Sequence, residues 1–398
     1  MLRTSRLSAL VSPVLRAAAW CGLLAACLGQ GMITPDLPAL PAPAYDSNQF
    51  VELLPGLRTA RAPEWVRPGL RVTYYSSASS GGGRHGSAGH GFTQVNVAAM
   101  NPNATVLDVR SYGLQGLEMT SPVLLIGGDS AVSVPGAGAD WWLNPAVLQQ
   151  VKEGQYGAEG ESVVIRMPCT VAGKTYNALR FQYECRGSRI SYMYDLASGL
   201  LLQSNTATGH PGRQMLTHNS FVGLRYLQLP WAAAGRVAWP GTFNVMNYRG
   251  TITVLVPGVP ATAMPMTAQA QITARGPDWV RHTVTSSFTA MAGMPPNTSV
   301  ANRVSGLAQI GGVWLPPAAL RTLRGGQVID QDPSTKITTT VSYVGNGPTG
   351  AREVVISEVS QVQRLDYAYD LSSGLLVGLY KADTPLYTRT QMRLTGVQ

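Results

Sequence analysis

Histidines are the first residues to examine for chemistry, because they act as metal ligands, general bases and members of catalytic triads. The chain of 398 residues contains five. His85 and His90 lie in the glycine-rich stretch SSGGGRHGSAGHGF, which has no Asp, Glu or Cys, so we interpret it as a hairpin loop. His210, His218 and His282 are isolated, have no H-x-x-x-H spacing and are expected to be exposed. The sequence therefore predicts no metal site.

Serines and carboxylates give no catalytic pattern either. The G-x-S-x-G motif of many serine hydrolases is absent, and Ser198-Gly199 and Ser373-Gly374 fall in turns. The most notable acids are interpreted as turn formers and not as a glycosidase pair: Asp195, Asp332 and Asp370. The glycine-rich segments do not have the spacing of a phosphate-binding loop. The sequence predicts neither a catalytic residue nor a cofactor, and this favours a protein that is not an enzyme.

Three phrases occur twice in the chain. Residues 191–204, SYMYDLASGLLLQS, return as residues 366–379, DYAYDLSSGLLVGL. WLNPAVLQQVKEGQ at Trp142 returns 172 residues later as WLPPAALRTLRGGQ at Trp314, and Pro68-Gly69 returns as Pro240-Gly241 at the same offset. Coincidental reuse of strand and turn phrases is the alternative. We interpret the repeats as a tandem duplication of a unit of roughly 170 residues, an ordinary domain size.

Strand signals dominate each repeat. TVLDVRSY alternates Leu107 and Val109 with Asp108 and Arg110, and ESVVIRM is expected to place Val163, Ile165 and Met167 on one face. Tyr192 and Tyr194 precede a tight turn at Asp195, and Tyr367 and Tyr369 precede one at Asp370, which predicts a hairpin in each unit.

A single convincing helix is expected in each repeat. Asn144 is a candidate N-cap, Pro145 is the first helical residue and Gly154 ends the first helix, whereas Pro317 and Gly325 frame the second. The fold class is therefore all-β, mainly antiparallel, with one short helix per unit. It is a tandem duplication of a curved-sheet or half-barrel-like unit. In its architecture such a unit resembles the half-barrel lipoprotein carriers of bacterial envelopes. The two units could form separate domains or share one sheet.

The composition fits a folded β protein. Charged residues make up 13% of the chain, while hydrophobic residues make up 45%. Low charge without low hydrophobicity argues against disorder. The formal net charge is +9. It falls to about +6 if Arg3, Arg6 and Arg16 leave with an export signal, and this mild, scattered charge predicts no nucleic-acid partner.

The N-terminus has the features of an export signal. Three arginines precede the apolar run AAAWCGLLAA, which ends in Leu24-Ala25-Ala26-Cys27. This run resembles the lipobox of bacterial lipoproteins. The resemblance implies removal of residues 1–26 and attachment of acyl chains such as palmitate to Cys27. Leu28 in place of an aspartate implies the outer membrane, with the chain facing the periplasm or the cell surface. An ordinary secretory signal is the alternative.

The remaining boundaries follow from composition and from the repeats. Residues 27–59 are rich in proline and alanine and are expected to form a lipid-anchored tether. The two repeat units are expected at 60–235 and 236–398. Cys169 and Cys185 are an even pair in an exported chain, which predicts a disulfide between facing strand positions. Two separate buried thiols are the alternative.

The tryptophans at matched positions give the remaining functional signal. Trp65, Trp142, Trp239 and Trp314 are expected to pack in the cores, or else to line an apolar or sugar-binding groove. The sequence therefore favours a non-enzymatic cell-envelope lipoprotein that binds or scaffolds, with an apolar or lipid-like ligand or an envelope protein as its partner. An envelope hydrolase, whose site is assembled from residues distant in sequence, is the competing hypothesis.

Overall fold

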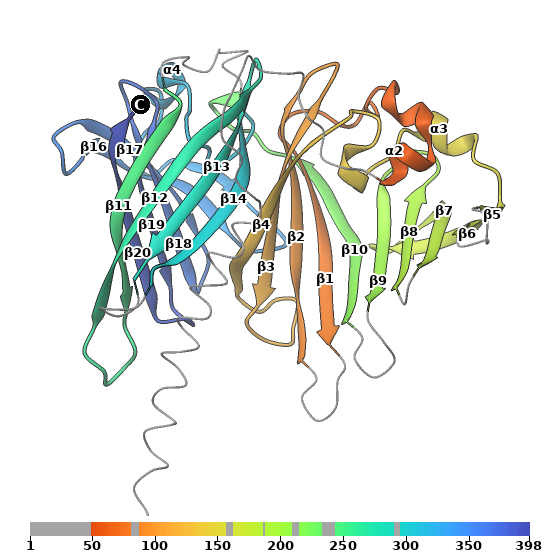
Figure 1. Ribbon diagram of the computed structural model, residues 1–398, viewed down its shortest axis with the longest axis horizontal. Helices are drawn as coiled ribbons and strands as arrows, with labels where there is room; N and C mark the ends of the chain where they lie inside the picture. Colours follow the sequence, from red (N-terminus) through yellow and green to blue (C-terminus); the bar gives the residue numbers. More distant parts are fainter. Residues whose placement is uncertain are drawn as a thin grey trace, which may run out of the picture. The chain divides into compact units, whose positions relative to one another are not determined.

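The computed structural model describes residues 49–80, 87–156, 162–185, 188–208, 215–232, 243–289 and 295–398. Its regular structure is mainly antiparallel β-sheet, arranged in two sheets of ten strands (Figure 1). By the density of their internal contacts, the described residues divide into two compact units. One contains residues 49–121 and 130–227, and the other contains residues 122–129 and 228–398.

The first sheet is an antiparallel meander in which the last strand returns to pair with the first. Its strands are β1 (Leu70–Ser80), β2 (Ser87–Met100), β3 (Thr105–Leu114), β4 (Val123–Ser133), β5 (Gly154–Tyr156), β6 (Ser162–Val171), β7 (Lys174–Cys185), β8 (Ser188–Asp195), β9 (Leu201–Thr208) and β10 (Met215–Tyr226). They are ordered β4-β3-β2-β1-β10-β9-β8-β7-β6-β5. The sheet curves, since β10 contacts β6, four positions away in this order.

The second sheet repeats this arrangement. Its strands are β11 (Val245–Val254), β12 (Thr262–Arg275), β13 (Trp279–Phe288), β14 (Asn297–Gly306), β15 (Val328–Gln331), β16 (Thr338–Asn346), β17 (Arg352–Val359), β18 (Gln363–Asp370), β19 (Leu376–Asp383) and β20 (Thr388–Val397). Their order is β14-β13-β12-β11-β20-β19-β18-β17-β16-β15. Each label is ten higher than its counterpart in the first sheet, which confirms the predicted fold class and tandem duplication.

The repeated phrases form the same hairpin turn in both sheets. In the first, Asp195 Oδ2 accepts hydrogen bonds from the Ser198 amide at 3.0 Å and from the Ser198 hydroxyl at 2.6 Å. In the second, Asp370 Oδ2 accepts the same two bonds from Ser373 at 2.7 and 2.6 Å. Asp332 also accepts from the amides two and three residues later, at 3.0 and 2.8 Å. These bonds confirm the three aspartates as turn formers.

The matched tryptophans occupy equivalent places. Trp142 forms an isolated antiparallel bridge to Leu200, and Trp314 forms the corresponding bridge to Leu375. The two indoles are 0% and 3% exposed, so both are core residues. Trp65 is partly buried against the first core, whereas Trp239 lies outside the described residues.

One short helix in each unit packs near these bridges. The helix α3 (Pro145–Gln149) begins at Asn144, whose Oδ1 accepts from the amides of Ala146 and Val147 at 2.9 and 3.2 Å. This confirms the predicted N-cap. The helix α4 (Pro317–Leu320) has no side-chain cap. Both helices end well before the glycines that the sequence suggested, at Gly154 and Gly325.

The segment assigned to the tether contributes to the first core. Residues 49–59 form the helix α2 (Gln49–Leu53) and a 3₁₀ turn (Pro55–Arg58), and α2 lies beside α3 in Figure 1. Phe50 and Leu57 are fully buried. The prediction of an extended tether is therefore wrong for residues 49–59, because these two side chains supply apolar surface to the sheet.

Two predicted strand faces also need correction. In the first part of β6, Val164 is 3% exposed while Ile165 is 43% exposed, so the buried side there is opposite to the predicted one. Farther along the strand, Cys169 and Val171 are buried. In β3 the charged residues Asp108 and Arg110 are buried and form a 2.9 Å ion pair. Both faces of β3 are covered, and alternation in the sequence therefore did not identify a solvent face.

Candidate functional site

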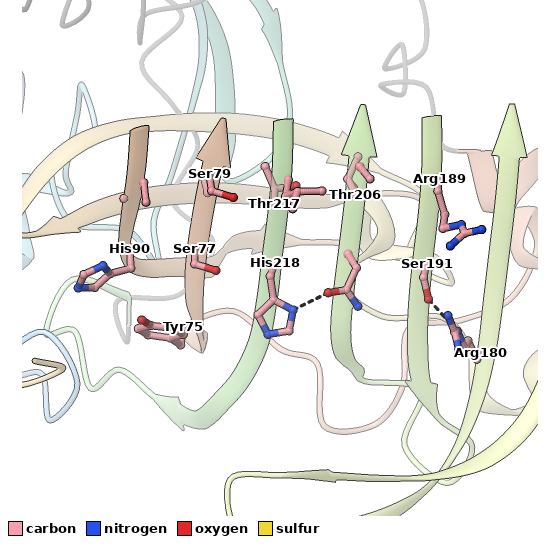
Figure 2. A pocket seen from close by; sticks show the side chains of 16 residues that line it. Tyr75, Ser77, Ser79, His90, Arg180, Arg189, Ser191, Thr206, Thr217 and His218 are labelled. Atoms are coloured by element: carbon pink, nitrogen blue, oxygen red, sulfur yellow. Dashed lines mark hydrogen bonds between the residues drawn. The ribbon is translucent and has the colours of Figure 1, made fainter. Parts of the chain in front are cut away.

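A pocket on the first sheet brings together two of the histidines, His90 and His218. It has a volume of about 600 Å³ and is lined by residues of β1, β2, β7, β8, β9 and β10 (Figure 2). His90 lies on β2 and His218 lies on β10. His90 was expected in a hairpin loop, but strand β2 begins at Ser87 and includes it. The described strands therefore place His90 on a fixed framework.

The pocket floor is a cross-strand row of polar side chains. Residues that pair directly in adjacent strands point to the same face of a sheet. Successive pairings connect, from β2 to β8, the residues His90, Ser77, His218, Asn205 and Ser191. Figure 2 shows this row across the strands. Residues from five strands, in two distant parts of the chain, thus share one face.

Hydrogen bonds fix both imidazoles. Nδ1 of His218 lies 2.6 Å from Oδ1 of Asn205. Because the amide oxygen accepts, Nδ1 carries the proton in this arrangement. Burial lowers the pKa of His218 below its usual value, which favours the neutral imidazole. Nε2 of His90 donates to the carbonyl oxygen of Gly116 at 2.8 Å.

Two arginines make one end of the pocket cationic. Nε of Arg180 on β7 donates to the hydroxyl of Ser191 at 3.0 Å, and Ser191 is 5% exposed. Arg189 on β8 is exposed and forms an ion pair with Glu184 at 2.5 Å. Glu184 does not line the pocket, and no other described carboxylate does. Glu184 therefore compensates the charge of Arg189, whereas no carboxylate among the described lining residues compensates that of Arg180.

The opposite face of this sheet is packed with aromatic side chains. Phe50 of α2 contacts Phe181, Tyr192 and Tyr194, with ring centroids at 5.0, 5.3 and 5.3 Å. Tyr194 is fully buried, and its hydroxyl donates to the Asp140 carbonyl oxygen at 2.8 Å. Burial, followed by the nearby charge of Asp140, raises the pKa of Tyr194, so the phenol stays neutral. This face is a packed core and not an open apolar groove.

His282 was expected to be exposed, but it is 4% exposed. It lies on β13, opposite Ile272 of β12 and Arg303 of β14. Burial, and to a lesser extent Arg303, lowers its pKa to about 3. A histidine with this pKa is neutral at pH 7 and is a poor general base. His282 is therefore a core residue of the second sheet.

The predicted facing arrangement of Cys169 and Cys185 is wrong. Cys169 is a free, buried thiol on β6, and burial raises its pKa. It pairs with Tyr176 of β7, whereas Cys185 is at the far end of β7 and pairs with Ser188. Nine residues of extended strand separate positions 176 and 185, or roughly 30 Å. The hairpin turn at Ala172-Gly173 sets this register.

Three of the cysteines and histidines named in the sequence analysis are not placed in the structure. Cys27, His85 and His210 lie outside the described residues. Within the described ranges, no group of three or more His, Cys, Asp or Glu side chains could hold a metal ion. The helices found there are too short or too polar to cross a membrane.

The arginines, the tyrosine and most hydroxyl residues of the pocket were not identified from the sequence. Ser77, Arg180 and Ser191 lie in segments that read as ordinary alternating strands. The hairpin turn at Asp195 predicts that β8 and β9 pair. It does not predict which residues of β8 and β9 face each other, because a register shift between Met193 and Tyr194 brings Ser191 opposite Asn205.

Comparisons with known proteins give no family. No protein-family model matches the sequence, and no curated protein matches it. Among solved structures, the chain is similar to MucB in the crystal structure of MucB in complex with MucA(peri). That alignment has 11% identity, a TM-score of 0.22 and coverage of 88% of this chain and 93% of the other. The complex structure of Pseudomonas aeruginosa MucA/MucB matches with 13% identity, a TM-score of 0.22 and coverage of 68% and 94%. Likeness at this level supports no functional statement.

Proposed function

We propose that this chain is a non-enzymatic binding module of the bacterial cell envelope. In this proposal acyl chains on Cys27 hold it at the outer membrane, and the pocket on the first sheet receives its ligand. The observation that carries the proposal is the row of polar side chains from His90 to Ser191, assembled on one face from separate strands. Ligand sites in proteins are typically concave and of this volume, with a few convergent polar groups.

A polar ligand fits this pocket better than the apolar ligand expected from the sequence. The aromatic core of the first unit offers no open apolar groove, because Phe50, Tyr74 and Trp142 are all fully buried. Along the pocket row, by contrast, Asn205 is exposed, and Ser77 and His218 are half-buried. A ligand that makes hydrogen bonds would replace water at these groups without leaving them unpaired.

A hydrolase is the second candidate, because Ser77, His218 and Asn205 are adjacent in the row and His218 is held by Asn205. A serine, a histidine and an amide in this order resemble a triad in composition. However, Ser77 lies within a strand that is paired on both sides, so its backbone amides are engaged in the sheet and do not form the pair of backbone donors that an oxyanion hole commonly uses. Covalent labelling of Ser77 by a fluorophosphonate would favour the hydrolase.

Native mass spectrometry tests the binding function. Cys27→Ser removes the acylation site, so that no acyl chain contributes to the measured mass. We expect this variant, purified from cells without strong detergent, to show a population heavier than the polypeptide, and denaturation should remove the extra mass. The bare polypeptide mass in every preparation, together with no mass shift after incubation with a small-molecule extract of the same cells, would contradict the proposal.

A further inference from the structure

The geometry points to a small organic anion as the ligand of the first-sheet pocket, with its anionic group at Arg180 and Ser191. This inference rests on the proposed binding function and adds the chemical class. The anionic group is a phosphate or a carboxylate, and the rest of the ligand is a hydroxyl-bearing body that extends along the row toward Tyr75 and His90.

Arg180 and Ser191 form the anion-binding end. A guanidinium has five N–H donors. One of them, on Nε, is used by the Ser191 hydroxyl at 3.0 Å, and no other hydrogen bond or ion pair of Arg180 is found among the described residues. Ser191 accepts from Arg180 and therefore keeps its own hydroxyl proton to donate. Donors on both side chains can thus be directed at one anionic group.

The second sheet shows that the fold does not require these polar groups. Arg180 pairs with Met193 on β8, and its counterpart Val355 pairs with Ala368 on β18. Ser191 pairs with Asn205, and its counterpart is Asp366. The equivalent row in the second sheet consists of Pro265, Thr251, Gln391, Tyr380 and Asp366. An apolar residue and a carboxylate thus replace the arginine and the serine, so the pair of Arg180 and Ser191 belongs to the first copy alone.

The dimensions of the pocket suit a ligand larger than a simple ion. Three strand spacings separate Tyr75 on β1 from Ser191 on β8, or roughly 14 Å. The volume of about 600 Å³ suits an organic molecule. Between the two ends the lining offers Ser77, Asn205 and His218, which hydrogen-bond to hydroxyl groups. Tyr75 supplies an aromatic surface at the far end, with its ring centroid 6.2 Å from that of His90.

Titration calorimetry on the full detergent-solubilised chain tests the inference, with four probes. Glucose 6-phosphate and glucuronate carry a phosphate and a carboxylate on a sugar, glucose is neutral, and inorganic phosphate lacks the sugar. We expect one site for at least one of the two sugar anions, with the neutral sugar and the free phosphate each bound at least about tenfold more weakly. Preference between the two sugar anions distinguishes a phosphate ligand from a carboxylate ligand.

Arg180→Gln should lower the affinity for the sugar anion by at least about tenfold, because glutamine removes the positive charge but keeps a similar side-chain length. Arg364→Gln is the matched control, since Arg364 occupies the place of Arg189 in the second sheet and the net charge changes equally. It should leave binding unchanged. Ser191→Ala is a second, smaller change, which keeps the test decisive if Arg180→Gln does not fold. It should also weaken binding of the sugar anion.

Two results would overturn the anionic assignment: no binding of either sugar anion to the folded chain, or an equal loss of binding in Arg180→Gln and Arg364→Gln. If a native ligand still co-purifies in that case, the binding function stands and only the anionic class is wrong. If neither a probe nor a native ligand binds, both are wrong.

Discussion

Replacing Gly199 by alanine should destabilise the first unit by about 3 kcal/mol or more. Gly199 has a φ of +77°, and an added Cβ would lie 1.8 Å from the carbonyl oxygen of Leu143. The Gly199 carbonyl also accepts a hydrogen bond from the Leu143 amide at 2.9 Å. The extra atom must therefore separate the repeated hairpin from the segment that carries Trp142. The loss of stability is measured by urea unfolding, with amide hydrogen exchange of first-sheet peptides as the probe.

Gly374→Ala should have the same effect on the second unit, because its φ is +76° and its Cβ would lie 2.0 Å from the Leu315 carbonyl oxygen. Gly173→Ala is the control. Gly173 has a φ of +73° with nothing within 4 Å of the added Cβ, so only backbone strain of about 1–2 kcal/mol is expected. Losses at Gly199 and Gly374 no larger than the loss at Gly173 would contradict the close docking of the hairpin in both copies.

Phe50→Ala should cost about 3–5 kcal/mol, the range for removing a large aromatic side chain from a core. Phe50 is 0% exposed and makes edge contacts with four rings of β7 and β8. Each such pair contributes about 0.5–1.5 kcal/mol beyond the buried area. In the same experiment, the amide hydrogens of first-sheet peptides should begin to exchange at a lower urea concentration in the variant than in the parent chain.

Val51→Ala on the same helix is the matched control, since Val51 is only half-buried and loses two methyl groups. Its cost should be about 1 kcal/mol or less. A Phe50→Ala chain as stable as the Val51→Ala chain would mean that α2 does not hold the aromatic core together, and that residues 49–59 behave as the tether predicted from sequence.

The duplication was predictable from the sequence because the repeated turn depends on residues that are close together in the chain. Asp195 and Asp370 need the same aspartate, serine and glycine spacing to close the turn, so the phrase persists in both copies. The side of each strand that is buried was less predictable. Val164 and Ile165 are both β-branched and apolar, so their composition does not indicate which faces the core. The position of α2 on the sheet decides that point.

The pocket was not predictable from local pattern. His90, Ser77 and His218 share a face only because β10 returns to pair with β1, a pairing between residues more than 140 positions apart. A shift of one residue in that register would send His218 to the opposite face. The cysteine prediction failed for a local reason. It assumed facing positions from the number of residues between the cysteines, whereas the turn at Gly173 sets the partner of Cys169.

The proposed function depends on the chain working at a membrane surface, and intact-mass analysis of the wild-type protein extracted from membranes tests this most directly. The lipobox-like run Leu24-Ala25-Ala26-Cys27 predicts a mature chain that begins at Cys27. Its mass should exceed that of the polypeptide by the mass of several acyl chains, which together bind a bilayer firmly. Cys27→Ser should lack the added mass. A wild-type chain recovered in the soluble fraction, beginning at another residue and without acyl mass, would contradict the account.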